Sequence, residues 1–313
     1  MKVFESTDVR NVALVGHGHS GKTSLAAGMI FATGASNRLT RVDEGNTITD
    51  FDDEEIARKM TISTSLVALE WKKKKLNVMD TPGFNLFLYD TKISMAAADA
   101  ALIVVDGCSG VEVMTERVWA YAEDYVLPRA FFINKLDRER SDFQRTVDNI
   151  TEVFGRHCLP IYLPIGAERD FCGIVDVISL KAYKYTPDGD GKGTEIPIPD
   201  NMADAAKAAH DALIEMVAEG NDALMEKFFD AGTLPVEDIM FGLHESVKED
   251  KIFPIMCGSA LRNIGTDLVM EFLQAFCPNP TEHPALGAMV GDHEEFKAIT
   301  DKDHVTAYVF KTI

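Results

Sequence analysis

The chain has 313 residues and a formal net charge of −19 at pH 7. A surface this acidic repels phosphate backbones at long range, so the charge argues against free nucleic-acid binding. Apolar residues make up 46% of the chain, enough for a sizeable core, and no run approaches the roughly 20 apolar residues that a membrane span needs.

The cysteines and the N-terminus bear on where the protein works. The five cysteines are scattered and form no Cys-x-x-Cys pair, which predicts free thiols rather than disulfides or a zinc site. The first residues, MKVFESTDVRNVALVG, lack the apolar segment of a signal peptide. We therefore expect a cytoplasmic, soluble, monomeric protein without a membrane partner.

From residue 9 to about 157, apolar strand-like runs alternate with helix-like stretches. In chain order, the predicted elements are a strand at 12–16, a helix at 22–34, a hairpin of strands 65–71 and 76–80 around the turn KKKK, a strand at 101–106, a helix near 112–125, a strand at 130–134 and a helix near 141–154. Strands that are apolar throughout and followed by helices predict an α/β fold, a mostly parallel sheet with helices on both faces.

The middle of the chain has a different pattern. Residues 159–250 predict two strands near 171–185, the turn DGDGKG and then helices, and they hold 7 Lys and Arg against 19 Asp and Glu. The earlier pattern resumes with a strand at 252–259 and a helix at 266–276. We therefore predict a first domain part (1–158), an inserted α+β subdomain (159–250) and the last part of the first domain (251–283). The remaining residues, 284–313, are predicted to be a linker and the first strand of another domain, VTAYVFKTI at 305–313. The acidic insertion is either a solvated face that aids solubility or a docking face.

The stretch GHGHSGKT, residues 16–23, follows a strand and opens a helix. This is the setting that a phosphate-binding loop requires, because its glycines let backbone N–H groups surround a phosphate at a helix N-terminus. Lys22 is expected to reach the β- and γ-phosphates, and Thr23 to ligate Mg²⁺. The expected phosphate-binding residues are Gly16, His17, Gly18, His19, Ser20, Gly21, Lys22, Thr23 and Ser24.

The stretch NKLD, residues 134–137, ends a predicted strand on the rim where open α/β sheets bind ligands. The Asp137 carboxylate can accept from both N1–H and the exocyclic amine of guanine, whereas adenine has no N1–H. The backbone of GSAL (258–261) after another strand suits the guanine oxygen, although it also fits a simple turn of small residues. The expected base-binding residues are Asn134, Lys135, Asp137, Ser259, Ala260 and Leu261.

Residues 78–87, VMDTPGFNLF, bear on catalysis. We expect Asp80 to hold Mg²⁺ through water and Gly83 to sense the terminal phosphate. Phe84 then occupies the place of a group that would handle the attacking water, and a Phe side chain can neither give nor take a proton. Thr61, in RKMTI, either completes the Mg²⁺ shell or simply begins a strand.

The motifs GHGHSGKT, RKMTI, DTPG, NKLD and GSAL, in this order, resemble those of translational GTPases, and of elongation factor G most closely. Their order and the insertion before GSAL imply a P-loop GTPase domain that binds GTP or GDP with Mg²⁺. The resemblance also implies the ribosome as partner, through its large-subunit factor-binding region and stalk protein, and an N-terminal fragment of a longer protein. Translational GTPases usually have His at position 84 and Asp at position 19, so the sequence resembles an atypical elongation factor G-like subfamily.

The motifs are compatible with three functions. The first is a slow GTPase acting in ribosome translocation or recycling, with Lys22, Thr61, Gly83 and the position of Phe84 as the catalytic set. The second is a GTP-dependent ribosome-binding switch with negligible hydrolysis, which Phe84 favours. The third, a metabolic enzyme that shares the P-loop, is disfavoured by NKLD and GSAL. His19 either supplies positive charge where relatives use a monovalent cation or turns to solvent.

Overall fold

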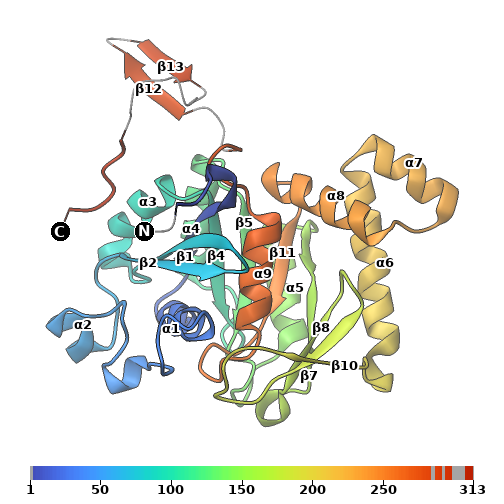
Figure 1. The fold of residues 1–313 in the computed structure, drawn as a ribbon, viewed down its shortest axis with the longest axis horizontal. Coiled ribbons are helices and arrows are strands. Elements are labelled where there is room, and N and C mark those ends of the chain that lie inside the picture. Colours follow the sequence, from blue (N-terminus) through green and yellow to red (C-terminus); the bar gives the residue numbers. More distant parts are fainter. Residues whose placement is uncertain (1–2, 283–285, 291–292, 298–306, 313) are drawn as a thin grey trace.

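The computed structural model describes residues 3–282, 286–290, 293–297 and 307–312 (Figure 1). Its largest element is a seven-stranded sheet with the order β2-β3-β1-β4-β5-β11-β6. The strands are β1 (Val9–Val15), β2 (Ser65–Trp71), β3 (Lys74–Asp80), β4 (Ala100–Asp106), β5 (Arg129–Asn134), β6 (Cys158–Pro160) and β11 (Phe253–Cys257). Every neighbouring pair is parallel except the β2–β3 hairpin. The predicted α/β fold is therefore confirmed.

Helices cover both faces of this sheet, which explains why its central strands are apolar throughout. All six residues of β5 are buried, as are six of the seven in β4. In Figure 1, α9 crosses the near face of the sheet, and α4 and α5 lie behind it. The covering helices are α1 (Lys22–Ala32), α3 (Leu88–Ala96), α4 (Val113–Asp124), α5 (Phe143–Phe154) and α9 (Thr266–Phe276).

The β2–β3 hairpin forms where the sequence predicts it, but its turn is shorter than the KKKK run. Strand β3 already begins at Lys74, so only Lys72 and Lys73 connect the strands. Both have positive φ, 42° and 73°, as the central residues of a two-residue type I′ hairpin turn require. The charged run was therefore assigned too many turn residues.

A second sheet lies beside the first. Its four antiparallel strands have the order β10-β9-β8-β7, with bounds β7 (Tyr162–Ile165), β8 (Gly173–Asp176), β9 (Lys181–Lys184) and β10 (Thr194–Ile196). Strands β8 and β9 are the two predicted near 171–185. Strands β7 and β10 were not predicted, because their formation depends on pairing with β8 and β9 rather than on a local pattern. Helices α6 (Ala203–Glu219), α7 (Asp222–Ala231) and α8 (Val236–Lys248) follow. The predicted boundary at residue 158 falls inside β6, which runs to Pro160 and belongs to the large sheet.

The end of the chain differs from the prediction. Strand β12 (Leu286–Val290) begins inside the predicted linker and pairs with β13 (His293–Lys297). The strand predicted at 305–313 does not form at residues 307–312, which have no regular secondary structure, and the rest of that stretch lies outside the described residues. A strand needs a partner for its backbone groups, and residues 307–312 pair with none of the described strands.

Two further predictions concern cysteines and membranes. All five cysteines are free thiols, and Cys158, Cys257 and Cys277 are buried. Burial raises the pKa of the Cys158 and Cys277 thiols to about 12, so both stay protonated at neutral pH. Among the described residues, no helix combines the length and the apolar character that crossing a bilayer requires.

Candidate nucleotide-binding site

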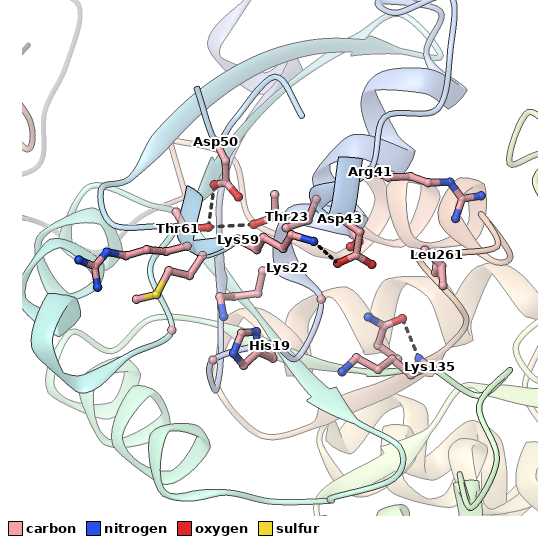
Figure 2. Close-up of a pocket in the computed structure, with 18 of the residues that line it drawn as sticks. His19, Lys22, Thr23, Arg41, Asp43, Asp50, Lys59, Thr61, Lys135 and Leu261 are labelled. Atoms are coloured by element: carbon pink, nitrogen blue, oxygen red, sulfur yellow. Dashed lines mark hydrogen bonds and ion pairs between the residues drawn. The ribbon is translucent and has the colours of Figure 1, made fainter. Parts of the chain in front are cut away.

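A cavity of about 450 Å³ opens above the ends of the central strands. It is lined by twelve of the residues singled out from the sequence: Gly18, His19, Gly21, Lys22, Thr23, Ser24, Thr61, Gly83, Phe84, Asn134, Lys135 and Leu261. Figure 2 shows Lys22 and His19 toward one end of this cavity and Lys135 and Leu261 toward the other. The other seven predicted residues, Gly16, His17, Ser20, Asp80, Asp137, Ser259 and Ala260, do not line it.

The loop between β1 and α1 takes a shape that depends on its glycines. Gly16 has φ 137°, and a side chain there would meet the Val104 carbonyl oxygen at 2.4 Å. Gly21 has φ 98° and lies against the side chain of Asn134, where a Cβ would approach Nδ2 to 2.2 Å. Both positions therefore require glycine, and the loop that results ends at the N-terminus of α1, which favours anions.

Lys22 lies beneath this loop and is 5% exposed. Its Nζ donates to the carbonyl oxygens of Gly16 at 3.1 Å and His17 at 2.8 Å. Burial lowers the pKa of Lys22 to about 8, although the negative charges of Asp80 and Asp50 oppose that shift. Gly83 lies close by, since a Cβ there would be 2.4 Å from the Lys22 Nζ. The DTPG turn and the phosphate loop therefore meet at the lysine.

Two hydroxyls meet on the other side of the cavity. The Thr23 and Thr61 Oγ1 atoms are 2.9 Å apart, and Thr61 also donates to Asp50 Oδ1 at 2.9 Å. Thr61 does not begin a strand, because β2 starts at Ser65. Burial raises the pKa of Asp50 to about 6. Asp50 was not predicted as a site residue, because no motif distinguishes it from the neighbouring acidic residues.

Glu55, in the short helix α2 (Asp53–Arg58), holds the Thr61 loop in place. It is 1% exposed, and its Oε1 accepts from the backbone N–H groups of Ile62 at 2.9 Å and Ser63 at 3.1 Å. Asp52 caps the same helix by accepting from the Glu54 N–H. The hydrogen bonds to Glu55 therefore hold the loop in the position where Thr61 contacts Thr23.

Asp80 has the properties of a cation ligand. It is fully buried, and neither carboxylate oxygen accepts a hydrogen bond of normal geometry from the described part of the chain. Burial and the Asp50 charge raise the pKa of Asp80 to about 7, and the nearby Thr49, Lys22 and Thr23 reduce that rise. A buried carboxylate without a hydrogen bond of normal geometry, close to the Thr23 and Thr49 hydroxyls, fits Mg²⁺, which prefers oxygen ligands and usually keeps several waters.

The Phe84 ring lies on the phosphate loop. A Cβ at Gly18 would be 2.7 to 3.0 Å from three atoms of this ring, so the absence of a side chain at Gly18 makes room for it. The His19 ring meets Phe84 edge to face, with centroids 5.1 Å apart and an interplanar angle of 83°. His19 itself has φ 64° and is exposed.

At the other end of the cavity, Asn134 joins two loops. Its Nδ2 donates to the Ser20 carbonyl at 2.8 Å, and its Oδ1 accepts from the Ala260 N–H at 2.9 Å. Asp137 accepts from the Ser259 hydroxyl at 2.5 Å. Lys135 has φ 64° and its Nζ pairs with Asp106 Oδ2 at 2.6 Å. No sequence motif predicts Asp106 as this partner. The NKLD and GSAL segments are therefore adjacent, although 122 positions separate Asp137 from Ser259.

The family described as the elongation factor Tu GTP binding domain matches residues 7–279. The chain belongs to this family. The matched range includes both sheets, the cavity and the helices of the insertion. The chain is therefore a translational GTPase domain, as the order of its motifs predicted.

A crystal structure of a protein from Thermus thermophilus is similar to this GTPase domain. The two share 33% sequence identity with a TM-score of 0.82 over 88% of this chain and 41% of the other. This chain thus spans about two fifths of the length of the structure that it matches. The similarity supports the P-loop GTPase fold of the whole matched region.

Proposed function

We propose that the cavity binds GTP and GDP with Mg²⁺, and that the protein hydrolyses GTP as an elongation factor G-like translation factor on the ribosome. The observation that carries this proposal is that one cavity joins Lys22 and Thr23 at one end with Asn134 and Leu261 at the other. The first pair suits phosphates, and the second belongs to segments with the donors and acceptors for guanine. Family membership supports the GTPase activity.

Thr23, Thr61 and Asp80 are the residues that would hold Mg²⁺, with Asp50 supporting Thr61. When bound, Mg²⁺ neutralises charge on the phosphate oxygens. The Asp80 carboxylate is buried and without a hydrogen bond of normal geometry to the described residues, which supports this assignment. The Thr61 contact to Thr23 offers a way to sense the γ-phosphate, because ordering of this loop would depend on what lies between the two hydroxyls.

GTP hydrolysis requires positioning and charge stabilisation more than acid–base chemistry. The phosphate loop and Lys22 hold the phosphates, and the Gly83 turn lies within reach of the Lys22 ammonium. The Phe84 ring lies against Gly18 and contributes no proton acceptor. We therefore propose a slow intrinsic rate, because a positioned acid or base typically contributes about 10²–10⁴-fold.

A second candidate function, a GTP-dependent ribosome-binding switch with negligible turnover, is favoured by the same packing of Phe84 on Gly18. In this function the GTP state itself is the signal. The two functions share the nucleotide site and differ only in whether hydrolysis follows binding. The first function would serve ribosome translocation or recycling.

The remaining proposals concern partners and organisation. The ribosomal factor-binding region and its stalk protein are proposed as partners, with the acidic insertion as a candidate contact for the stalk. We further propose a cytoplasmic monomer of the atypical elongation factor G-like subfamily. The division into a G domain interrupted by residues 159–250 also stands as a proposal, with its first boundary moved past Pro160. His19 remains a candidate source of positive charge near the phosphates.

The test measures single-turnover GTP hydrolysis with and without ribosomes, beside a Phe84→His variant and with an ATP competition for binding. We expect GTP to displace a fluorescent guanine nucleotide while ATP does not. If the parent is slow and Phe84→His gains about 10²-fold or more with ribosomes, Phe84 limits hydrolysis. If the parent already turns over quickly with ribosomes and the variant changes little, water is positioned by other groups. Equal competition by ATP would refute guanine recognition.

A further inference from the structure

Lys59 occupies a backbone conformation that is unusual for its residue type. It ends helix α2 with φ 54°, in the left-handed region where glycine is the usual residue. The turn is fixed from both sides by Glu55, whose carbonyl oxygen accepts from the Lys59 and Met60 N–H groups and whose carboxylate binds the Ile62 N–H. A non-glycine residue in this conformation costs about 1 kcal/mol, and such costs cluster at functional sites.

The side chain of Lys59 lines the nucleotide cavity. Figure 2 shows it extending across the cavity toward Asp43. Its Nζ is 4.0 Å from Asp43 Oδ1, at the outer limit of an ion pair, and the two side chains are 55% and 85% exposed. Contacts of this kind contribute from nothing to about 1 kcal/mol. The ammonium of Lys59 is therefore weakly engaged.

Four other cations around the cavity have closer partners, whereas the side chain of Arg138, which also lines it, makes no ion pair or hydrogen bond with the described residues. Arg41 pairs with Asp188 at 2.9 Å and Lys135 with Asp106 at 2.6 Å, while Arg58 is held by Glu54 on its own helix. Lys22 donates to two backbone carbonyl oxygens in the phosphate loop. Lys59 differs from these four, because a ligand can take its charge without breaking a short contact.

We propose that Lys59 is a phosphate-binding residue that exchanges Asp43 for the phosphate chain of the bound nucleotide and closes the Thr61 loop over it. The inference rests on the proposed binding of guanine nucleotides in this cavity. Two observations support it together: a left-handed backbone held by Glu55, and a long cationic side chain laid across the cavity with a weak partner. Lys59 lies two residues before Thr61, so a bond to phosphate would fix that loop from a second point.

The experiment compares the parent chain with Lys59→Gly and Lys59→Arg. Dissociation constants for GTP, GDP and guanosine are measured by displacement of a fluorescent guanine nucleotide, and stability by urea unfolding. Lys73→Gly is the matched control, because Lys73 also has positive φ (73°) but lies in the β2–β3 turn. Both glycine variants remove one positive charge and relieve the same kind of backbone strain.

We expect Lys59→Gly to raise the dissociation constants for GTP and GDP by about 10- to 100-fold, as for a lost hydrogen bond to a charged group. The dissociation constant for guanosine should stay within about twofold of the parent value. Lys59→Arg should stay within about threefold of the parent, and Lys73→Gly should match it. Both glycine variants should be at least as stable as the parent. Parental GTP affinity in Lys59→Gly, or an equal loss for guanosine, would overturn the inference. A parent that binds no guanine nucleotide would instead refute the proposed function, and this inference with it.

Discussion

At the scale of single residues, the cavity depends on side chains whose partners are far away in the sequence. Asn134 contacts Ser20 in the phosphate loop and Ala260 in the GSAL turn, and it is 1% exposed. Gly21 packs against it so closely that no other residue fits. The shape of the empty site therefore depends on one amide as much as on any residue expected to touch the nucleotide.

Replacing Asn134 by Ala is expected to destabilise the nucleotide-free protein by about 2–4 kcal/mol. The change leaves the Ser20 carbonyl and the Ala260 N–H without their partner, and an unsatisfied buried polar group costs about 1–3 kcal/mol. Urea unfolding without nucleotide measures the effect. Asn201→Ala, at an exposed position, is the control and should change stability by no more than about 0.5 kcal/mol. A loss below about 1 kcal/mol for Asn134→Ala would show that the loops hold each other without it.

At the scale of elements, the start of β5 and the end of α8 are joined by a buried cation. Arg129 is 4% exposed, lies 4.1 Å from the Trp119 ring centroid and pairs with Asp250 at 3.4 Å. Burial nevertheless raises the pKa of Asp250 to about 6, since loss of solvent outweighs the attraction of Arg129. The ionised form of Asp250, which joins the end of α8 to the sheet, is therefore destabilised by its burial.

This shift predicts a pH dependence. The folded-state pKa of Asp250 lies above the ordinary value of 3.8, so its contribution to stability is full below about pH 4 and is lost as pH rises through 6. Asp250→Asn removes the titration. Its free energy of unfolding relative to the parent should therefore rise between pH 4 and pH 7, by at most about 3 kcal/mol.

Urea unfolding at pH 4, 5, 6 and 7 tests this expectation. Asp211→Asn, at an exposed position on α6, is the control. A relative stability of Asp250→Asn that stays constant with pH, or that falls as pH rises, would contradict the raised pKa.

At the scale of the whole molecule, residues 307–312 lie against the loop that carries Thr61. Lys311 Nζ donates to the Ser63 hydroxyl at 3.2 Å and to the Thr64 carbonyl oxygen, and Phe310 packs on the main core. The groove between them is also lined by Asp90 and Ile93 of α3. Residues 307–312 therefore contact both the loop that follows Thr61 and helix α3, which follows Gly83.

Replacing Lys311 by Met should loosen the loop at residues 62–65. The ammonium loses two acceptors, and hydrogen bonds to charged groups contribute about 1.5–3 kcal/mol, so amide exchange there should accelerate by about tenfold or more. Hydrogen exchange of the nucleotide-free chain measures this. Lys207→Met, which removes an exposed ion pair within α6, is the control. Unchanged protection at 62–65 would show that the end of the chain does not stabilise this loop.

The sequence by itself determined much of the architecture. Runs such as AALIVVD and RAFFIN predict strands covered on both faces, and the glycine spacing before Lys22 predicts the phosphate loop because the φ values at Gly16 and Gly21 favour glycine. The family also followed from the order of five motifs. These features are local, since each depends on neighbouring residues and on periodicity.

Only the tertiary structure decided which distant groups meet. Three contacts join segments whose spacing in the sequence does not predict that they meet. They are the Phe84 ring against Gly18, the hydrogen bond between Thr61 and Asp50, and the Lys59 side chain across the cavity. The short strands β7 and β10 and the missing strand at 307–312 have the same origin, because strand formation requires a partner whose position the local sequence does not encode. Propensity and spacing act along the chain, whereas packing, desolvation and hydrogen-bond pairing depend on the folded arrangement.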